Sequence, residues 1–379
     1  MTGRPPVALF IGCMSGTSLD GVDAVLAEFD SVRPARVLGH AWEPYPDALR
    51  RELMALNGRG EDELHRSSLA ANAVARAYAS VVERLLEGTA ANRAALRAIG
   101  AHGQTVRHRP QAFDGSGYTV QLLNGALLAE LTAVDVVCDF RSRDLAAGGQ
   151  GAPLVPAFHR AVFGEPGAAV AVLNIGGIAN LTLLPPDGEV LGFDTGPGNL
   201  LMDMWVERHL GQRFDAGGAW ARSGRVQPAL LRAMQAEPFF ALPAPRSTGR
   251  DLFDAAWLEA ALAHAEPDTR PEDVQATLAE LTVWAVLDSL DRHAPGTTRL
   301  GVCGGGARNA HLMARLRQGL PGSRVEATDA WGVPADQVEA LAFAWLGAAF
   351  VGRRAGNLPG VTGARGLRVL GALHPGPHP

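Results

Sequence analysis

One pattern occurs twice in this chain and limits its fold more than any other feature: an apolar strand, a glycine-containing polar tip and a returning apolar strand. In the first half, residues 7–11 and 22–29 flank the segment GCMSGTSLDG. In the second half, residues 168–173 and 181–184 flank NIGGIAN. Apolar runs bounded by Gly, Ser, Thr and Asn are typical of β-hairpins. The repetition predicts two related lobes, each built around one hairpin.

A third glycine segment follows the strand predicted at 300–303. Gly304, Gly305 and Gly306 come next, and a helix is predicted to begin near Asn309. Backbone N–H groups of glycine-rich turns and of helix N-termini bind phosphate oxygens without a lysine. Each tip alone is more often only a tight turn. Together, the three tips favour a nucleotide bound between two lobes.

The charge balance excludes several classes of protein. The chain has 379 residues, 34 basic and 39 acidic, with a net charge of −5, and every basic residue is arginine. A basic nucleic-acid-binding surface is therefore not expected. The absence of lysine excludes Schiff-base enzymes, lysine-containing P-loops and protein kinases. The length and the 47% hydrophobic content predict two folded domains.

The cysteines and the apolar runs bear on the compartment. Cys13, Cys138 and Cys303 form no C-x-x-C pair and no plausible disulfide set. No window reaches 18 uninterrupted apolar residues, and the N-terminal apolar stretch is too short for a signal sequence. We therefore expect a cytoplasmic protein with no membrane partner.

Asp194 is the carboxylate that most resembles a catalytic group. It follows the strand predicted at 191–193 and precedes a Gly-Pro-Gly-Asn turn that leads into a helix over 200–209. A carboxylate at such a strand end suits a general base or a phosphate-site acid. The alternative is a helix-capping or turn aspartate, which composition alone favours.

Two further polar segments follow predicted strands. DFRSRD places Arg141 and Arg143 where a guanidinium binds a carboxylate or a phosphate, with strand-end salt bridges as the equal alternative. HGQT, residues 102–105, concentrates hydrogen-bonding groups of the kind that a sugar site needs. No second histidine lies at a metal-ligand spacing from His102.

The motif series resembles that of the anhydro-N-acetylmuramic acid kinases. The matching segments run in family order through nearly the whole chain: IGCMSGTSLDGVD, AHGQTVRH, DFRSRDLAAGGQGAPLVPAFH, NIGGIAN, GFDTGPGNLLMD, CGGGARN and VEALAFAWL. The resemblance implies an α/β fold, namely the two-lobed ATPase fold of sugar kinases, Hsp70 and actin, with duplicated mixed-sheet lobes and a central cleft. It also implies that ATP and water convert 1,6-anhydro-N-acetylmuramic acid into N-acetylmuramic acid 6-phosphate and ADP during peptidoglycan recycling.

The resemblance also assigns residues. Asp194 would be the catalytic base, activating water while the departing O6 receives the γ-phosphoryl group. Gln104, Thr105, Arg143 and Glu339 would contact the substrate. The ATP-binding residues would be Gly16, Thr17, Ser18, Leu19, Asp20, Gly21, Val22, Asp23, Gly176, Gly177, Asn180, Gly304, Gly305, Gly306 and Asn309.

The family reaction implies Mg²⁺ beside ATP, but the sequence leaves the ligands open. Many members of the superfamily place an acid two residues before the first Gly-Thr, where this chain has Met14. The metal ligands stay unassigned, with Asp20 and Glu339 as candidates only.

The lobes are predicted at 1–150 and 151–379, with the last helix, near Glu339, able to pack back on the first lobe. The resemblance also implies a homodimer, although the apolar spacing around Trp284 and Trp345 suits a core better than an interface. Two alternatives stay open from the residues alone: an ordinary sugar kinase of the same fold, and a non-catalytic nucleotide switch like actin or a chaperone.

Overall fold

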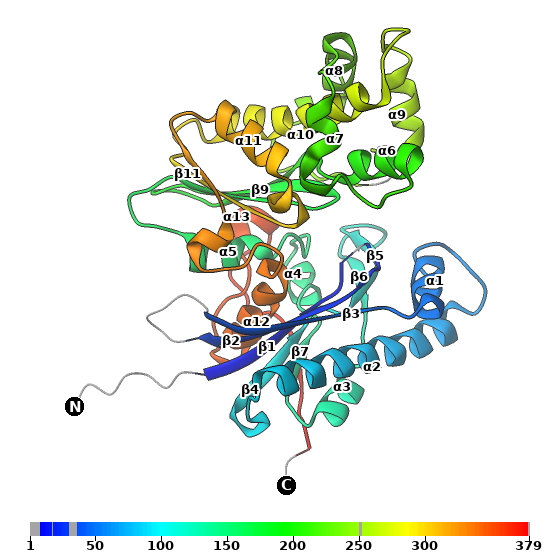
Figure 1. Cartoon of the computed structure of the whole chain (residues 1–379). Coiled ribbons are helices and arrows are strands. Elements are labelled where there is room, and N and C mark those ends of the chain that lie inside the picture. Colours follow the sequence, from blue (N-terminus) through cyan, green and yellow to red (C-terminus); the bar gives the residue numbers. More distant parts are fainter. Residues whose placement is uncertain (1–7, 17, 30–35, 250–251, 378–379) are drawn as a thin grey trace. The chain divides into compact units, whose positions relative to one another are not determined.

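The computed structural model describes residues 8–16, 18–29, 36–249 and 252–377 (Figure 1). The chain divides into two compact units: residues 1–162 with 337–379, and residues 163–336. The first border lies at residue 162 and not at the predicted 150, whereas residues 337–379 group with the first unit, as the sequence analysis allowed for the helix near Glu339. The reason lies in the helix after residue 337, which is buried around nearly its whole circumference and therefore needs a core on several sides.

The first unit is built on a mixed sheet. Its described strands have the order β13–β7–β4–β1–β2–β3. The first three strands along the chain are antiparallel neighbours, whereas β4 and β7 run parallel to β1. The bounds are β1 Ala8–Met14, β2 Gly21–Phe29, β3 Arg36–Pro44, β4 Leu96–Ala101, β7 Val136–Cys138 and β13 Ala372–His374, and a separate pair is formed by β5 Gln104–Pro110 and β6 Gly117–Leu122.

Helices cover both faces of this sheet. Alternate residues of β1 point to opposite faces: Ile11 and Cys13 share a core with α2 (Glu63–Thr89) and α3 (Gly125–Thr132). Between them, Gly12 faces α12 (Val338–Val351). The remaining described α-helices of this unit are α1 Asp47–Ala55, α4 Ser142–Ala146, α5 Val155–Phe163, which runs to the boundary, and α13 Pro359–Thr362.

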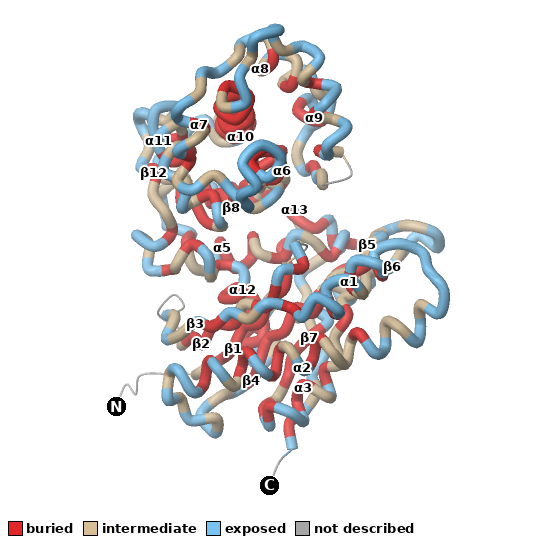
Figure 2. Tube along the Cα trace, turned by 45° about the vertical axis from the view of Figure 1, so that its right-hand side comes forward, coloured by how far each residue is buried: buried red, intermediate tan, exposed pale blue. Residues whose placement is uncertain are grey.

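Close contact between α12 and the sheet depends on two glycines. A Cβ at Gly12 would lie 1.9 Å from the Ala340 carbonyl oxygen, and one at Gly100 would lie 2.0 Å from that of Phe343. Both positions therefore admit only glycine unless the helix moves away. Figure 2 shows β1, β2, β4 and α12 as buried elements of this unit.

The second unit repeats the same topology. Its sheet has the order β10–β9–β8–β11–β12, with the first three strands antiparallel and the last two parallel to β8. Numbered in chain order within each sheet, the second sheet reads 3-2-1-4-5, and the first has the same order with β13 added as a sixth strand beside β7. The bounds are β8 Val170–Ile175, β9 Ile178–Leu184, β10 Leu191–Pro197, β11 Arg299–Cys303 and β12 Arg324–Ala327.

The core of the second unit lies between one face of this sheet and its helices. Leu173 and Ile175 of β8 share it with Leu281 and Val286 of the central helix α10, which Figure 2 shows as buried. The described α-helices are α6 Leu200–Leu210, α7 Ala219–Ser223, α8 Pro228–Gln235, α9 Ala255–Leu262, α10 Pro271–His293 and α11 Ala310–Gly319.

The sequence pattern locates most of these elements. Both predicted hairpins form, the helix expected at 200–209 lies within one residue of α6, and the helix expected near Glu339 is α12. One prediction about position is wrong: Asp194 does not follow its strand, because β10 continues to Pro197. The Gly-Pro-Gly sequence predicts a strand end, but Gly196 stays within the strand because a β-bulge between Asp194 and Gly196 accommodates it.

Candidate functional site

The first hairpin tip, residues 15–20, joins β1 to β2. The Leu19 and Val22 side chains lie in the core, so these two predicted nucleotide contacts offer only their backbone. Leu19 has a positive φ of 56°, a strained conformation for a leucine that its burial supports. Ser18 donates to the Asp20 carboxylate at 2.7 Å. Thr17, also predicted to bind ATP, lies outside the described residues.

Glycines shape this tip in different ways. A Cβ at Gly21 would lie 2.2 Å from the Glu43 carbonyl oxygen of β3, so Gly21 is required by packing. A Cβ at Gly16 would have the Ser18 hydroxyl oxygen as its nearest neighbour, 3.6 Å away, so the backbone here is open to a ligand. An open glycine backbone at a hairpin tip is suited to an approaching phosphate.

Several charged side chains follow this tip in the first unit. Asp23 on β2 accepts from His40 at 2.9 Å, and Glu339 begins α12. Burial disfavours the charged form of Glu339 and raises its pKa. The negative charge of Asp23 raises that pKa further. The Arg141 guanidinium acts in the opposite direction. The two carboxylates and the arginine therefore sense one another electrostatically within the first unit.

The predicted substrate residues of the first unit differ in their surroundings. Gln104 is fully buried, and its amide donates to the Gly16 carbonyl oxygen at 3.1 Å. The Thr105 hydroxyl accepts from Gln121 at 3.2 Å across the β5–β6 pair. Arg143 lies on α4 with its side chain exposed. Gln104 therefore contacts the first hairpin tip itself, which the sequence did not indicate.

The second tip, residues 174–180, joins β8 to β9 and is bonded to the segment after Asp194. The Gly198 and Asn199 N–H groups donate to the carbonyl oxygens of Gly177 and Gly176, each at 2.8 Å. The Thr282 hydroxyl of α10 holds the Gly198 carbonyl oxygen at 3.1 Å. Backbone bonds thus fix the GFDTGPGN segment against the tip.

Three polar side chains form a row across the sheet. Asn174, Asn180 and Asp194 are direct neighbours in the registers of β8–β9 and β9–β10. Directly opposed residues on neighbouring strands place their side chains on one face. All three are half-buried among buried apolar positions. The strand register thus brings Asp194 beside Asn180.

The surroundings of Asp194 favour a proton acceptor. One carboxylate oxygen accepts from the Thr248 N–H at 2.9 Å and from the Ser247 hydroxyl at 3.2 Å. Burial raises the pKa of Asp194 above its ordinary value, although these two bonds and Arg246 lower it in part. The second carboxylate oxygen accepts no hydrogen bond from the described residues.

Sequence reasoning missed the loop that holds Asp194. The buried Arg246 donates to the Asp194 backbone carbonyl oxygen at 3.2 Å and to the carbonyl oxygens of Phe240 and Leu242 at 2.8 and 2.9 Å. Its own carbonyl oxygen accepts from the Asp194 N–H at 2.9 Å. The segment PRST has no glycine-rich or strand-end pattern, so nothing in the sequence pointed to it.

The third glycine segment packs on the second tip. Gly304 has a φ of +76°, and a Cβ there would lie 2.3 Å from the Asn174 side-chain oxygen. A Cβ at Gly306 would lie 2.4 Å from the Ile175 side chain. The Asn309 side-chain oxygen accepts from two N–H groups of α11 and caps that helix. Gly304 and Gly306 are thus required by packing. A Cβ at Gly305, in contrast, would have no neighbour closer than 3.6 Å.

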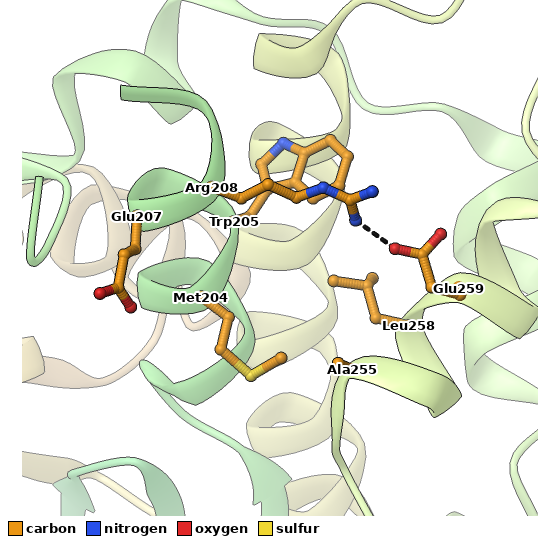
Figure 3. Close-up of a pocket in the computed structure, with 7 residues that line it drawn as sticks. All are labelled: Met204, Trp205, Glu207, Arg208, Ala255, Leu258 and Glu259. Atoms are coloured by element: carbon orange, nitrogen blue, oxygen red, sulfur yellow. Dashed lines mark hydrogen bonds and ion pairs between the residues drawn. The ribbon is translucent and has the colours of Figure 1, made fainter. Parts of the chain in front are cut away.

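A separate hollow of about 290 Å³ lies between α6 and α9 (Figure 3). Arg208 lies over the Trp205 ring, 5.4 Å from its centre, and pairs with Glu259. None of the residues that the sequence singled out lines this hollow.

Two absences concern the described part of the chain. Within the described ranges, no three His, Cys, Asp or Glu side chains gather as a metal site would require. Among the helices that the structure describes, none is both long and apolar enough to cross a membrane.

Two α/β units with one strand order, each carrying a hairpin with a glycine-containing tip, define a two-lobed ATPase of the class that includes sugar kinases, actin and Hsp70 chaperones. The family model described as anhydro-N-acetylmuramic acid kinase matches residues 8–376. The chain belongs to the anhydro-N-acetylmuramic acid kinase family.

Similar proteins from several bacteria carry the same description. An anhydro-N-acetylmuramic acid kinase of Variovorax paradoxus is 60% identical over 97% of this chain and 99% of its own length. One of Bordetella petrii is 58% identical over 98% and 97%. Among solved structures, component A of the (R)-2-hydroxyglutaryl-CoA dehydratase of Acidaminococcus fermentans is 12% identical over 89% of this chain and 96% of that chain, with a TM-score of 0.49. That likeness is too distant for a functional argument.

Proposed function

We propose that the chain is an ATP-dependent kinase that opens 1,6-anhydro-N-acetylmuramic acid with water and phosphorylates its O6, giving N-acetylmuramic acid 6-phosphate and ADP in peptidoglycan recycling. Family membership over residues 8–376 supports the reaction. The observation that carries the mechanism is the half-buried Asp194, whose pKa is raised and which shares a polar row with the second tip.

Asp194 acts as the base. Its carboxylate accepts a proton from water, and the water oxygen bonds to the anomeric carbon while the bond between that carbon and O6 breaks. The released O6 attacks the γ-phosphorus of ATP, and ADP leaves. The proton on Asp194 returns to solvent. A raised pKa makes the carboxylate a stronger base than an exposed aspartate, which suits removal of a proton from water.

The two tips and the third glycine segment are proposed to bind ATP. At Gly16, Gly176, Gly177 and Gly305 a Cβ would have no neighbour closer than 3.6 Å, so a nucleotide can approach their backbone. Phosphoryl transfer depends chiefly on positioning and on stabilising the spread negative charge. Backbone N–H groups provide both without a lysine.

Mg²⁺ is proposed as the second cofactor, and the residues fit it. Burial raises the pKa of Glu339 most and the negative charge of Asp23 raises it further, and a bound cation would relieve both effects. Mg²⁺ in phosphate sites takes one or two carboxylates together with phosphate oxygens and waters, so a three-carboxylate cluster is not needed. When bound, it would neutralise phosphate charge. Asp20 is the weaker candidate, since its carboxylate already accepts from Ser18.

The substrate contacts are also proposals. Arg143 has an exposed guanidinium suited to the lactyl carboxylate of the sugar. Thr105 and Glu339 are proposed to bind sugar hydroxyls. Gln104 is proposed to act through the first tip, because its amide donates to Gly16.

Cytoplasmic location and a homodimer stay predictions. Trp284 contacts the Phe240 ring at 5.1 Å, and Trp345 contacts that of Phe158 at 6.3 Å. The apolar helices around both tryptophans therefore pack within their own units, and the dimer prediction has only family resemblance in its favour.

The proposed function is tested by comparing three acceptors with ATP and Mg²⁺: the anhydro sugar, free N-acetylmuramic acid and no sugar. We expect ADP and a sugar phosphate with the anhydro sugar. Phosphorylation of the free sugar alone would identify an ordinary sugar kinase. ATP binding without any sugar phosphate would identify a nucleotide switch.

A further inference from the structure

His102 has no part in the proposed chemistry, yet it lies directly behind the first tip. It follows β4, is 5% exposed, and its ring lies 4.7 Å from that of Phe343 on α12. Burial and the nearby Arg141 charge lower its pKa to about 3, so the ring is neutral at physiological pH. A buried neutral histidine offers one hydrogen-bond donor and one acceptor.

The partners of His102 determine which nitrogen carries the proton. Arg141 approaches Nε2 through Nη2 at 2.9 Å and through Nε at 3.3 Å. A guanidinium can only donate, so Nε2 must accept. Nδ1 lies 3.3 Å from the Ser15 carbonyl oxygen, which can only accept, so Nδ1 must donate. Both ends of the ring therefore require the same tautomer, with the proton on Nδ1.

This contact orients the first tip. In a planar trans peptide, the carbonyl of Ser15 and the N–H of Gly16 point in opposite directions. With its carbonyl directed at His102, the Ser15–Gly16 peptide turns the Gly16 N–H away from the HGQ segment. The Ser15 hydroxyl donates to the Gly103 carbonyl oxygen at 3.1 Å and accepts from Tyr78 at 2.8 Å, which fixes the same residue a second time.

Arg141 is itself fixed from its other side. Its Nη1 donates to the Gly151 carbonyl oxygen at 2.8 Å, and the Gly151 N–H donates to Asp144 at 2.8 Å. The fully buried Asp144 also accepts from Asn357 at 2.7 Å and Thr362 at 2.8 Å. Through Gly151, the position of Arg141 is thus defined by a buried carboxylate that accepts from three donors.

We infer that His102 is a positioning residue that transmits the fixed position of Arg141 to the Ser15–Gly16 peptide, and so directs the Gly16 N–H toward the ATP phosphates. The inference rests on the proposed function, since it needs the first tip to bind ATP. His102 contacts no substrate in this role. It acts through the peptide that it orients.

Steady-state kinetics of two variants test this role. His102→Leu fills the space but neither donates nor accepts, whereas the amide of His102→Asn can donate to the Ser15 carbonyl. We expect His102→Leu to raise KM for ATP about tenfold, the scale of one lost hydrogen bond, with a smaller change in kcat. His102→Asn should recover most of this loss. His65→Leu, on the exposed side of α2, is the matched control.

A purely structural role predicts a different result. In that case thermal stability would fall in both variants while KM for ATP stayed at the wild-type value, and the inference would be overturned. It would equally be overturned if His102→Asn bound ATP as weakly as His102→Leu.

The tautomer gives a test that needs neither activity nor a variant that folds. In ¹⁵N-histidine-labelled wild-type protein, long-range ¹H–¹⁵N spectra should show His102 as the neutral Nδ1–H form. An Nε2–H form or a protonated ring would contradict the inference. If the wild type made no sugar phosphate, the proposed function would fail, whereas the spectrum would still decide how His102 is bonded to Arg141 and Ser15.

Discussion

Asp194 combines two opposing influences on one carboxylate. Burial raises its pKa, while the Thr248 N–H, the Ser247 hydroxyl and Arg246 stabilise the charged form. Desolvation exceeds the stabilising contacts, so the net direction is upward. A carboxylate in this position is a better base at the cost of some stability of the fold.

The activity should report this shift. A base must be deprotonated, so kcat/KM should fall as the pH falls through the pKa of Asp194. Because that pKa is raised, the acidic limb should lie above pH 3.8, the ordinary aspartate value. The measurement is a pH–rate profile, with circular dichroism at each pH to confirm that the protein is folded. An acidic limb at or below pH 3.8 would contradict the assignment.

The free energy of unfolding should change with pH in the opposite direction to kcat/KM. The folded state has the higher pKa and holds its proton more strongly, so ionisation of Asp194 lowers the free energy of unfolding as the pH rises through that pKa. Asp194→Asn cannot ionise and can still accept from Thr248 and Ser247. We expect its Tm at pH 7 to equal or exceed that of the wild type, with the difference shrinking below pH 4. A markedly lower Tm, with the exposed Asp187→Asn unchanged, would show that the charge stabilises the fold.

At the scale of elements, the sequence predicts the strands and tips because apolar runs and glycine turns are local patterns. The loop at 246–248 was not predictable, because its role depends on Arg246 reaching the carbonyl oxygens of Phe240 and Leu242. The same holds for His102 and Arg141, whose bond joins residues 39 positions apart. The side-chain pairs that complete the site are long-range contacts with no local pattern.

The contact of α12 with the first sheet gives a prediction for Gly12. Gly12→Ala places a Cβ 1.9 Å from the Ala340 carbonyl oxygen, so the helix must move. We expect a loss of about 1–3 kcal/mol or more in the free energy of unfolding, measured by urea denaturation. Gly88→Ala is the control, since no atom lies within 4 Å of its Cβ on α2. Equal stability of the two variants would contradict the close packing of α12.

At the scale of the whole molecule, the repeated hairpin correctly predicts two units with one topology. The first border lies at residue 162 and not at 150, and the helix near Glu339 returns to the first unit, as the sequence analysis allowed. α12 is separated from β1 by more than 320 residues of chain, yet it packs on that strand through Gly12.

Removing residues 337–379 tests this arrangement. The truncated chain loses α12 and β13, so the first unit loses one covering layer and an edge strand. We expect hydrogen exchange to show loss of protection in β1, β2 and β4, while β8 and α10 stay protected. Removal of only residues 378–379 is the control. Preserved protection of β1 in the longer truncation would show that the first unit folds without α12.

The most direct test of the central claim follows the oxygen of water. The protein is incubated with ATP, Mg²⁺ and 1,6-anhydro-N-acetylmuramic acid in ¹⁸O-water, and mass spectrometry of the product is compared between wild type and Asp194→Asn. We predict a 6-phosphate with one ¹⁸O at the anomeric carbon from the wild type, formed about 10²- to 10⁴-fold more slowly by the variant. A phosphorylated product without ¹⁸O, or an Asp194→Asn variant as fast as the wild type, would contradict the account.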